Sequence, residues 1–122
     1  MAPTRIILAD HHALFRRGLA NLLACEAGLE VVGEADDGVE ALTLARRLKP
    51  DVVLMEIAMP AMDGVEVMRQ IKAEVPGVRV IFLTASDTEQ IPLEVLQSGA
   101  QHCLFKTIEL SALCGAVRNP LV

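Results

Sequence analysis

The fold is decided by the stretch Asp51-Val-Val-Leu-Met-Glu56-Ile-Ala-Met-Pro60-Ala-Met-Asp63-Gly64. It predicts a buried strand that ends in an acid, then a loop, then the start of a helix. Other apolar runs of similar length predict further strands. These runs are almost continuously apolar rather than alternating, which is typical of a parallel sheet covered on both faces. The predicted strands lie at residues 6–9, 30–33, 52–55, 78–83 and 102–105.

The segments between the predicted strands carry helix signals. Helix starts are predicted at Asp37, Asp63 and Ser86, because each is followed three positions later by Glu. Strict alternation of five strands with five helices predicts an α/β doubly wound sheet with right-handed crossovers. Pro92 would lie inside the fourth helix and remove a backbone donor, so we expect that helix to be kinked, late-starting or loosely held. Helical spacing of apolar residues predicts core-facing stripes made of Phe15, Leu19, Leu22 and Leu23 and of Leu110, Leu113 and Val117.

Length and hydrophobicity fit a single domain without a membrane segment. The chain has 122 residues, the size of one domain with its own core. Hydrophobic residues make up 52% of it, yet no apolar run reaches the roughly 18 residues of a membrane span. Asp10 interrupts the first apolar run too early for a signal peptide. We therefore expect a cytoplasmic location and no membrane partner.

Charge and cysteine content argue against two further kinds of site. The net charge of −5 predicts that this segment does not bind nucleic acid directly, because phosphate contacts need clustered Lys and Arg. Arg16-Arg17 and Arg46-Arg47 are expected to be ordinary solvated charges. Cys25, Cys103 and Cys114 are odd in number and lack Cys-x-x-Cys spacing. This pattern predicts reduced core thiols rather than disulfides or a zinc knuckle.

Polar residues follow four of the predicted strands. Asp10 ends the first strand and Glu56 the third. Thr84 ends the fourth strand and Lys106 the fifth. Each alone would be unremarkable, because a strand-end Asp or Thr is often a helix cap. Ligands of an open parallel sheet bind beyond the carboxyl ends of the strands, so the set predicts one site suited to a phosphoryl group.

A series of motifs runs in fixed order through almost the whole chain: Ile7-Leu-Ala-Asp-His-His-Ala-Leu-Phe-Arg-Arg-Gly-Leu19, Val31-Val-Gly-Glu-Ala-Asp-Asp-Gly38, Asp51-Val-Val-Leu-Met-Glu-Ile-Ala-Met-Pro60, Met62-Asp-Gly64, Leu83-Thr84-Ala85, Gly99-Ala100 and Phe105-Lys106. On these residues the chain resembles the receiver domain of two-component response regulators, in particular the NarL/FixJ (LuxR-type) transcription regulators. The resemblance implies a flavodoxin-like fold, with a five-stranded parallel sheet in the order 2-1-3-4-5 and five helices. It also implies that residues 1–122 are one receiver domain and that a C-terminal DNA-binding domain is absent from this chain.

The resemblance also implies a chemistry. In the family, a histidine kinase passes a phosphoryl group to the Asp after the third strand, assisted by Mg²⁺. If these roles are carried over by position, the metal ligands would be Asp10, the residue at position 56 and the backbone carbonyl of Ala58. Thr84 would be the switch hydroxyl and Lys106 the counter-cation of the phosphoryl oxygens. No organic cofactor is implied.

Three residues depart from the family pattern. Glu56 stands at the phosphoacceptor position, where the family has Asp. Its carboxylate lies one carbon, about 1.5 Å, farther from the backbone, and misplacing a reacting group by about 1 Å can lower the reaction rate roughly 100-fold. We therefore expect phosphotransfer to be abolished or very slow. His11 replaces an acid of the pocket and so disfavours Mg²⁺, leaving weak Mg²⁺ binding if any. Imidazole would prefer a transition metal, although a lone solvated or capping His is the alternative. Cys103 occupies the position of the switch aromatic, which puts coupling to the outer surface in doubt.

The leading hypothesis is therefore a signalling module rather than an enzyme. Glu56 would be either a natural departure or a deliberate replacement that imitates the phosphorylated state, and its histidine kinase would be lost or bypassed. Output would pass through a homodimer and an attached or partner DNA-binding domain. The contacts would come from the fourth helix, fifth strand and fifth helix, or from the first and fifth helices. The alternatives are a hydrolase that uses Asp10 and Glu56 as a carboxylate pair, and a flavodoxin-like small-molecule binding domain. Against them, the chain has neither a Gly-x-Ser-x-Gly elbow nor a Gly-rich phosphate loop.

Overall fold

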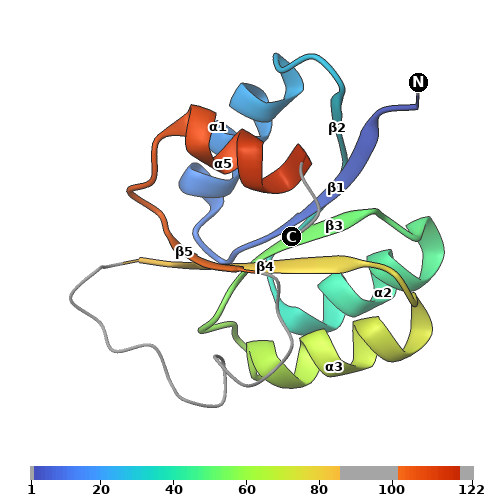
Figure 1. Ribbon diagram of the computed structural model, residues 1–122. Helices are drawn as coiled ribbons and strands as arrows, with labels where there is room; N and C mark the ends of the chain where they lie inside the picture. Colours follow the sequence, from blue (N-terminus) through green and yellow to red (C-terminus); the bar gives the residue numbers. More distant parts are fainter. Residues whose placement is uncertain (1, 86–101, 119–122) are drawn as a thin grey trace.

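The computed structural model describes residues 2–85 and 102–118. In this part of the chain, strands and helices follow one another in the order that the sequence predicts (Figure 1). The strands are β1 (Thr4–Ala9), β2 (Leu29–Ala35), β3 (Val52–Glu56), β4 (Arg79–Thr84) and β5 (His102–Phe105). The helices are α1 (Ala13–Ala24), α2 (Gly38–Leu48), α3 (Gly64–Glu74) and α5 (Leu110–Arg118).

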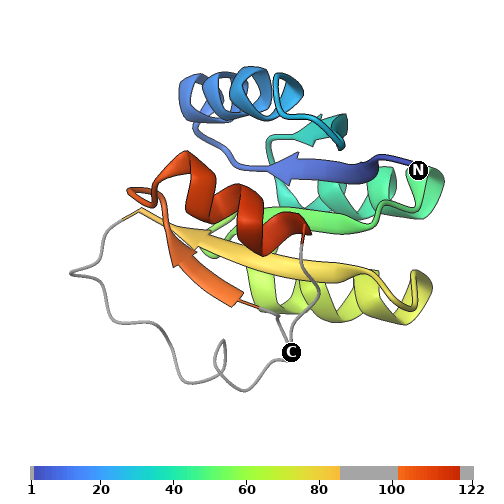
Figure 2. The same ribbon diagram turned by 45° about the horizontal axis from the view of Figure 1, so that its top comes forward.

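All strand pairs are parallel, and the sheet order is β2-β1-β3-β4-β5. The predicted flavodoxin-like sheet is thus confirmed. Helices α1 and α5 cover one face of the sheet and α2 and α3 the other (Figures 1 and 2). Each face has its own core, because successive residues of a strand point to opposite faces. Ile7 and Val53 lie in the core under α2 and α3, whereas Ile6 and Leu54 lie in the core under α1 and α5.

Two predicted helix starts are confirmed by their capping bonds. The Asp37 carboxylate accepts a hydrogen bond from the backbone N of Glu40 (2.8 Å), and Glu40 in turn accepts one from the backbone N of Asp36. The Asp63 carboxylate accepts one from the backbone N of Val65 (2.7 Å). These bonds satisfy amide groups that a helix terminus otherwise leaves unpaired. The predicted start at Ser86, the fourth helix and Pro92 lie outside the described residues.

Two predictions of burial are wrong. Leu22 was expected in the core-facing stripe of α1, but it is 52% exposed. It lies at the edge of that stripe, beside a groove between α1 and α5 that neither helix fills. Cys25 was expected to be a core thiol, but it is exposed just after the end of α1. Leu22 borders the groove and Cys25 follows the end of α1, so neither side chain is buried against the sheet. The spacing of apolar residues along a helix does not show where such packing ends.

The loop that follows Glu56 is held close to the strand end by a glycine. A Cβ atom added at Gly64 would lie 2.7 Å from the carbonyl oxygen of Ile57 and 3.2 Å from that of Glu56. Both neighbours are backbone atoms, which cannot rotate away as a side chain would. Gly64 therefore lets α3 begin directly against the loop that leaves the site.

We expect Gly64→Ala to lower the free energy of unfolding by about 1–3 kcal/mol, the usual cost of overpacking. Thermal unfolding followed by circular dichroism measures the effect as a lower Tm. The matched control is Gly115→Ala in α5, where a Cβ meets nothing within 4 Å. That change should stabilise the helix by roughly 0.5–1 kcal/mol. Equal Tm values for the two variants would contradict the steric role of Gly64.

Candidate functional site

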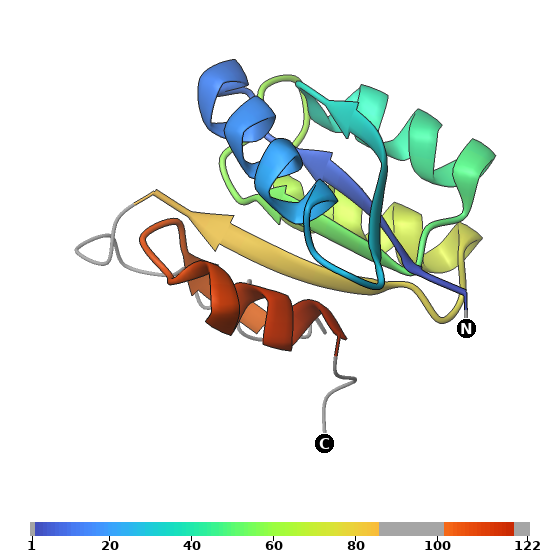
Figure 3. The ribbon, with the colours of Figure 1, turned by 90° about the horizontal axis from the view of Figure 1, so that it is seen from above.

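The strands are parallel, so the carboxyl ends of β1, β3, β4 and β5 lie at one edge of the sheet; Figure 3 shows from above that β1 and β4 point the same way. In the register, Ala9 of β1 pairs with Met55 of β3, which places Asp10 next to Glu56. Thr84 of β4 pairs with Phe105 of β5, which precedes Lys106. Among the described residues, the buried polar or charged ones are Asp10, Glu56 and Thr84, at 4%, 4% and 7% exposure.

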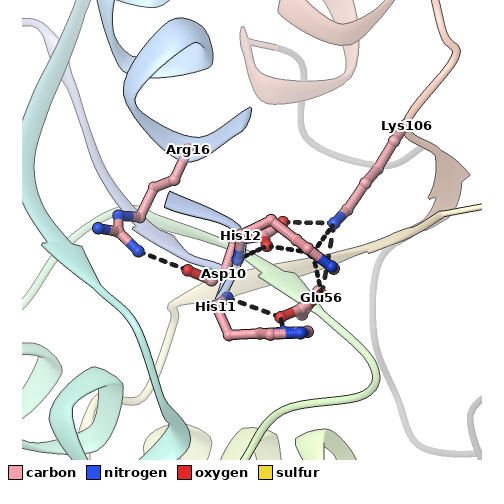
Figure 4. Close-up of polar contacts among 6 residues, drawn as sticks. All are labelled: Asp10, His11, His12, Arg16, Glu56 and Lys106. Carbon is pink, nitrogen blue, oxygen red and sulfur yellow. Dashed lines mark hydrogen bonds and ion pairs between the residues drawn. The ribbon is translucent and has the colours of Figure 1, made fainter. Parts of the chain in front are cut away.

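The ammonium group of Lys106 lies between the two buried carboxylates (Figure 4). Its Nζ is 2.7 Å from Asp10 Oδ2 and 3.3 Å from Glu56 Oε2. The backbone N of Lys106 donates to the Thr84 carbonyl (2.8 Å), which fixes where the side chain leaves β5. The same ammonium lies 4.7 Å from the centre of the Phe15 ring, close enough for a cation–π contact. One cation therefore compensates part of the charge of two buried acids.

Two histidines complete the pocket from the turn after β1. The backbone N of His11 donates to Glu56 Oε1 (2.7 Å), and the Nδ1 of its ring contacts the same oxygen. The backbone N of His12 donates to Asp10 Oδ1 (2.8 Å). The His12 Nδ1 lies 3.2 Å from Asp10 Oδ1 and 3.5 Å from Glu56 Oε2. The two ring centres are 3.9 Å apart.

These contacts change what the sequence suggested for the histidines. His11 does not stand alone in solvent, because it contacts Glu56 through both its backbone and its ring. His12, which the sequence did not reveal, contacts Asp10 through its backbone and ring and lies 3.3 Å from the Lys106 Nζ. It occupies the N-cap position of α1, although its side chain makes no capping bond. Its place directly after two strand-end site residues was the signal that could have revealed it.

Arg16 is a second residue whose role the sequence did not reveal. It was expected to be a solvated charge, yet its side chain is only 14% exposed. Its guanidinium donates to the backbone carbonyl of Asp10 (2.6 Å) and to Glu34 (3.1 Å), which also pairs with Arg17. Arg16 thereby ties α1 to the turn that carries the acid. The expectation of plain solvation is wrong for this residue.

The remaining predicted site residues lie around the same edge. Thr84 is buried at the end of β4. Cys103 lies in β5 opposite Phe82 and packs against the core under α2 and α3, and burial raises the pKa of its thiol. Ala58 is exposed in the loop between β3 and α3. The strand ends thus bring Asp10, Glu56, Thr84 and Lys106 together, whereas Cys103 lies within its strand.

The family of the chain follows from comparison with known proteins. A model described as the response regulator receiver domain matches residues 6–118. The chain belongs to this family. Response regulator GacA of Pseudomonas viridiflava is 40% identical over 114 residues, which cover 93% of this chain and 53% of GacA. Transcriptional regulatory protein LiaR of Bacillus subtilis is 39% identical over 114 residues, which cover 93% of this chain and 54% of LiaR.

Solved structures support the same assignment. The signal receiver domain of the putative response regulator NarL from Mycobacterium tuberculosis matches with a TM-score of 0.86 and 33% identity. The match covers 98% of this chain and 100% of that one. The chain spans about half the length of the curated relatives it matches.

The receiver assignment confirms the expected class and overturns one alternative. Receiver domains of two-component systems are signalling domains and not enzymes, so the carboxylate hydrolase is wrong. In the part of the chain that the structure describes, no helix is long and apolar enough to cross a membrane.

Receiver domains bind Mg²⁺ at the phosphorylation site, but the donor set of this receiver suits that ion poorly. Mg²⁺ demands near-ideal octahedral oxygen coordination. Here the two carboxylates of Asp10 and Glu56 share the pocket with the imidazoles of His11 and His12. The Lys106 ammonium already neutralises one oxygen of each acid. The residues of this pocket therefore fit Mg²⁺ poorly.

The cysteines allow a test of the described packing that is independent of the pocket's function. Cys25 is exposed, whereas Cys114 is buried and Cys103 half-buried. Burial raises the pKa of the Cys103 and Cys114 thiols, which lowers their thiolate fraction at any given pH.

We expect an aromatic disulfide reagent at pH 8 to modify the native chain in one fast phase and two slow ones. Cys25→Ser should remove the fast phase, and Cys103→Ser should leave it unchanged. The slow phases should accelerate as the pH rises further, because more thiolate forms as the pH approaches the raised pKa values. A fast phase that survives in Cys25→Ser would contradict the burial of the other two thiols.

Proposed function

We propose that this receiver domain signals by protein contact from a pocket that Glu56 holds in one state, without phosphotransfer. The observation that carries the proposal is the pairing of both Glu56 oxygens. Oε1 accepts from the His11 backbone (2.7 Å), and Oε2 lies 3.3 Å from Lys106 Nζ. By family resemblance, Lys106 is the residue that would hold phosphoryl oxygens. Glu56 thus already pairs with Lys106, the cationic side chain that a phosphoryl group would need.

Two physical effects make Glu56 a poor phosphoacceptor. Its carboxylate lies one carbon, about 1.5 Å, farther from the backbone than that of Asp, and misplacement near 1 Å can cost roughly 100-fold in rate. Its oxygens are also engaged by an amide, an imidazole and an ammonium, which reduces the electron density available for attack. Attack on a phosphodonor would first have to break these contacts. A phosphodonor would therefore meet an acid that is both misplaced and already paired.

Mimicry of the phosphorylated state by Glu56 would be partial. A carboxylate resembles one pair of phosphoryl oxygens, but it brings a single negative charge, whereas a phosphoryl group brings about −1.5 to −2. The Lys106 contact to Glu56 is also longer than its contact to Asp10, 3.3 Å against 2.7 Å. The pocket would therefore sit between the two family states, with a bias that does not depend on a kinase. A histidine kinase would be bypassed or lost.

Output would reach transcription through an attached or partner DNA-binding domain, as the names of the relatives suggest. GacA is a response regulator and LiaR a transcriptional regulatory protein. The net charge of −5 on this segment leaves DNA contact to another domain. Signalling from this domain would then consist of arranging its partners.

A second copy of this chain is the partner that the surface of α1 fits. Leu14 is 89% exposed and Leu22 is 52% exposed, and both border an apolar groove of about 320 Å³ between α1 and α5. The groove is lined further by Phe15, Leu19 and Leu113. Protruding leucines and a receiving groove on one face are what a two-fold interface needs, because the same patch must complement itself. We therefore include a homodimer through α1 and α5 in the proposal.

The blocked relay is tested by incubating the chain and a Glu56→Asp variant with a small phosphodonor and Mg²⁺. Intact-mass spectrometry should detect one added phosphoryl group on the Glu56→Asp variant and none on the native chain. Glu56→Gln serves as the negative control, because it keeps the length of Glu and removes the charge. Equal labelling of the native chain and the Glu56→Asp variant would overturn the block. A Glu56→Asp variant that stays unlabelled would locate the block elsewhere in the pocket.

The dimer is tested by Leu14→Asp, which places a charge at the centre of the proposed interface. Sedimentation equilibrium should show a dissociation constant raised at least about tenfold, since desolvating the carboxylate costs more than about 1.4 kcal/mol. The matched control is Val39→Asp on α2, which is 52% exposed on the opposite side of the sheet (Figure 1). A native chain that stays monomeric at high concentration, or equal effects of both variants, would contradict this interface.

A further inference from the structure

Two imidazoles and two carboxylates converge in the pocket. Asp10, His11, His12 and Glu56 each offer one ligand atom, and these atoms all lie within 4.8 Å of one another. Three of the residues are consecutive after β1, and the fourth ends the neighbouring strand β3 (Figure 4). The pairing of Ala9 with Met55 fixes the two elements against each other. The sheet therefore brings the turn that carries three donors next to the strand end that carries the fourth.

The spacing of the donors suits a small four-coordinate ion. Zinc bonds to imidazole nitrogen and carboxylate oxygen measure about 2.0–2.2 Å, so the ligand atoms of a tetrahedral site lie about 3.3–3.6 Å apart. The His12 Nδ1 is 3.2 Å from Asp10 Oδ1 and 3.5 Å from Glu56 Oε2. The His11 Nδ1 lies closer than this to Glu56 Oε1, but its side chain is 39% exposed and has room to withdraw. All four ligand atoms lie within 4.8 Å of one another, so small side-chain shifts would bring them to this spacing.

Lys106 occupies one side of the pocket, where its Nζ contacts Asp10 Oδ2 and Glu56 Oε2 and lies 3.3 Å from His12 Nδ1. Asp10 directs Oδ2 to Lys106 and Oδ1 to His12, while the Oε1 of Glu56 contacts His11. Within residues 2–85 and 102–118, the buried Asp10 Oδ2 has no hydrogen-bond partner besides this ion pair. Two buried carboxylates thus share one ammonium. A further cation is thus electrostatically favoured.

The chemistry of the donors selects the class of that cation. Imidazole nitrogen suits zinc, copper, nickel and iron, whereas Mg²⁺ requires oxygen ligands in an octahedral arrangement. We infer that the pocket binds one transition-metal ion of the zinc class through Asp10, His11, His12 and Glu56. The inference shares its pocket with the proposed function but does not depend on it. Metal binding is measured as Co²⁺ affinity and absorption, whereas the block to phosphotransfer is measured as a change in intact mass. Either test can therefore fail without the other.

Co²⁺ serves as the spectroscopic probe, because its visible absorption reports the coordination number and Zn²⁺ displaces it from such sites. The folded native chain should bind a single Co²⁺ ion with the absorption of a four-coordinate site, and Zn²⁺ should remove that signal. Mg²⁺ in large excess should not. His11→Asn and His12→Asn should each weaken Co²⁺ binding at least about tenfold, since even residues that only support metal ligands contribute roughly 10- to 100-fold. Circular dichroism checks that both variants remain folded.

Two matched controls locate the site. His102 is the third histidine of the chain and begins β5, at the opposite end of that strand from Lys106, so His102→Asn should bind Co²⁺ like the native chain. Cys25→Ser removes the exposed thiol and should also change nothing. The inference is overturned if His11→Asn and His12→Asn both retain native affinity, if either control loses it, or if Mg²⁺ displaces Co²⁺ as readily as Zn²⁺ does.

Discussion

The pocket depends on a single ammonium placed between two buried acids. Asp10 and Glu56 are each 4% exposed, and burying a charged group is costly unless it is paired. Lys106 lies within ion-pair distance of both. Removing one partner of a buried ion pair leaves an uncompensated charge, which costs far more than the pair contributes. Lys106 therefore holds the ends of β1, β3 and β5 in one arrangement.

The sheet explains why the polar groups gather at this edge and not elsewhere. Both faces of the described sheet are covered by aliphatic cores, which leave no place for an unpaired charge. Strands that run parallel all end at the same edge, so residues from four distant parts of the sequence become neighbours. This is why apolar runs ending in Asp10, Glu56, Thr84 and Lys106 predicted the site as well as the fold. The apolar runs predicted the strands, and the polar residues at their ends predicted the site.

Sequence patterns fell short where tertiary packing decides the outcome. Strand boundaries were off by a few residues, as at β2, which extends from Leu29 to Ala35. Leu22 has helical spacing, but none of the described elements covers it. Arg16 was expected in solvent because its partners, the Asp10 carbonyl and Glu34, become adjacent only when α1 packs beside β2. His12 was overlooked for the same reason, since its contacts come from the strands and from Lys106.

The residues at positions 11 and 56 are physically linked. A longer acid at position 56 extends toward the turn after β1, where Glu56 Oε1 meets the backbone and ring of His11. An acid at position 11 would face that oxygen with like charge, and a like charge close by disfavours ionisation of both groups. An imidazole can instead donate a hydrogen bond there. The histidine thus avoids the repulsion that an acid at position 11 would create, and it gives the pocket mixed nitrogen and oxygen donors.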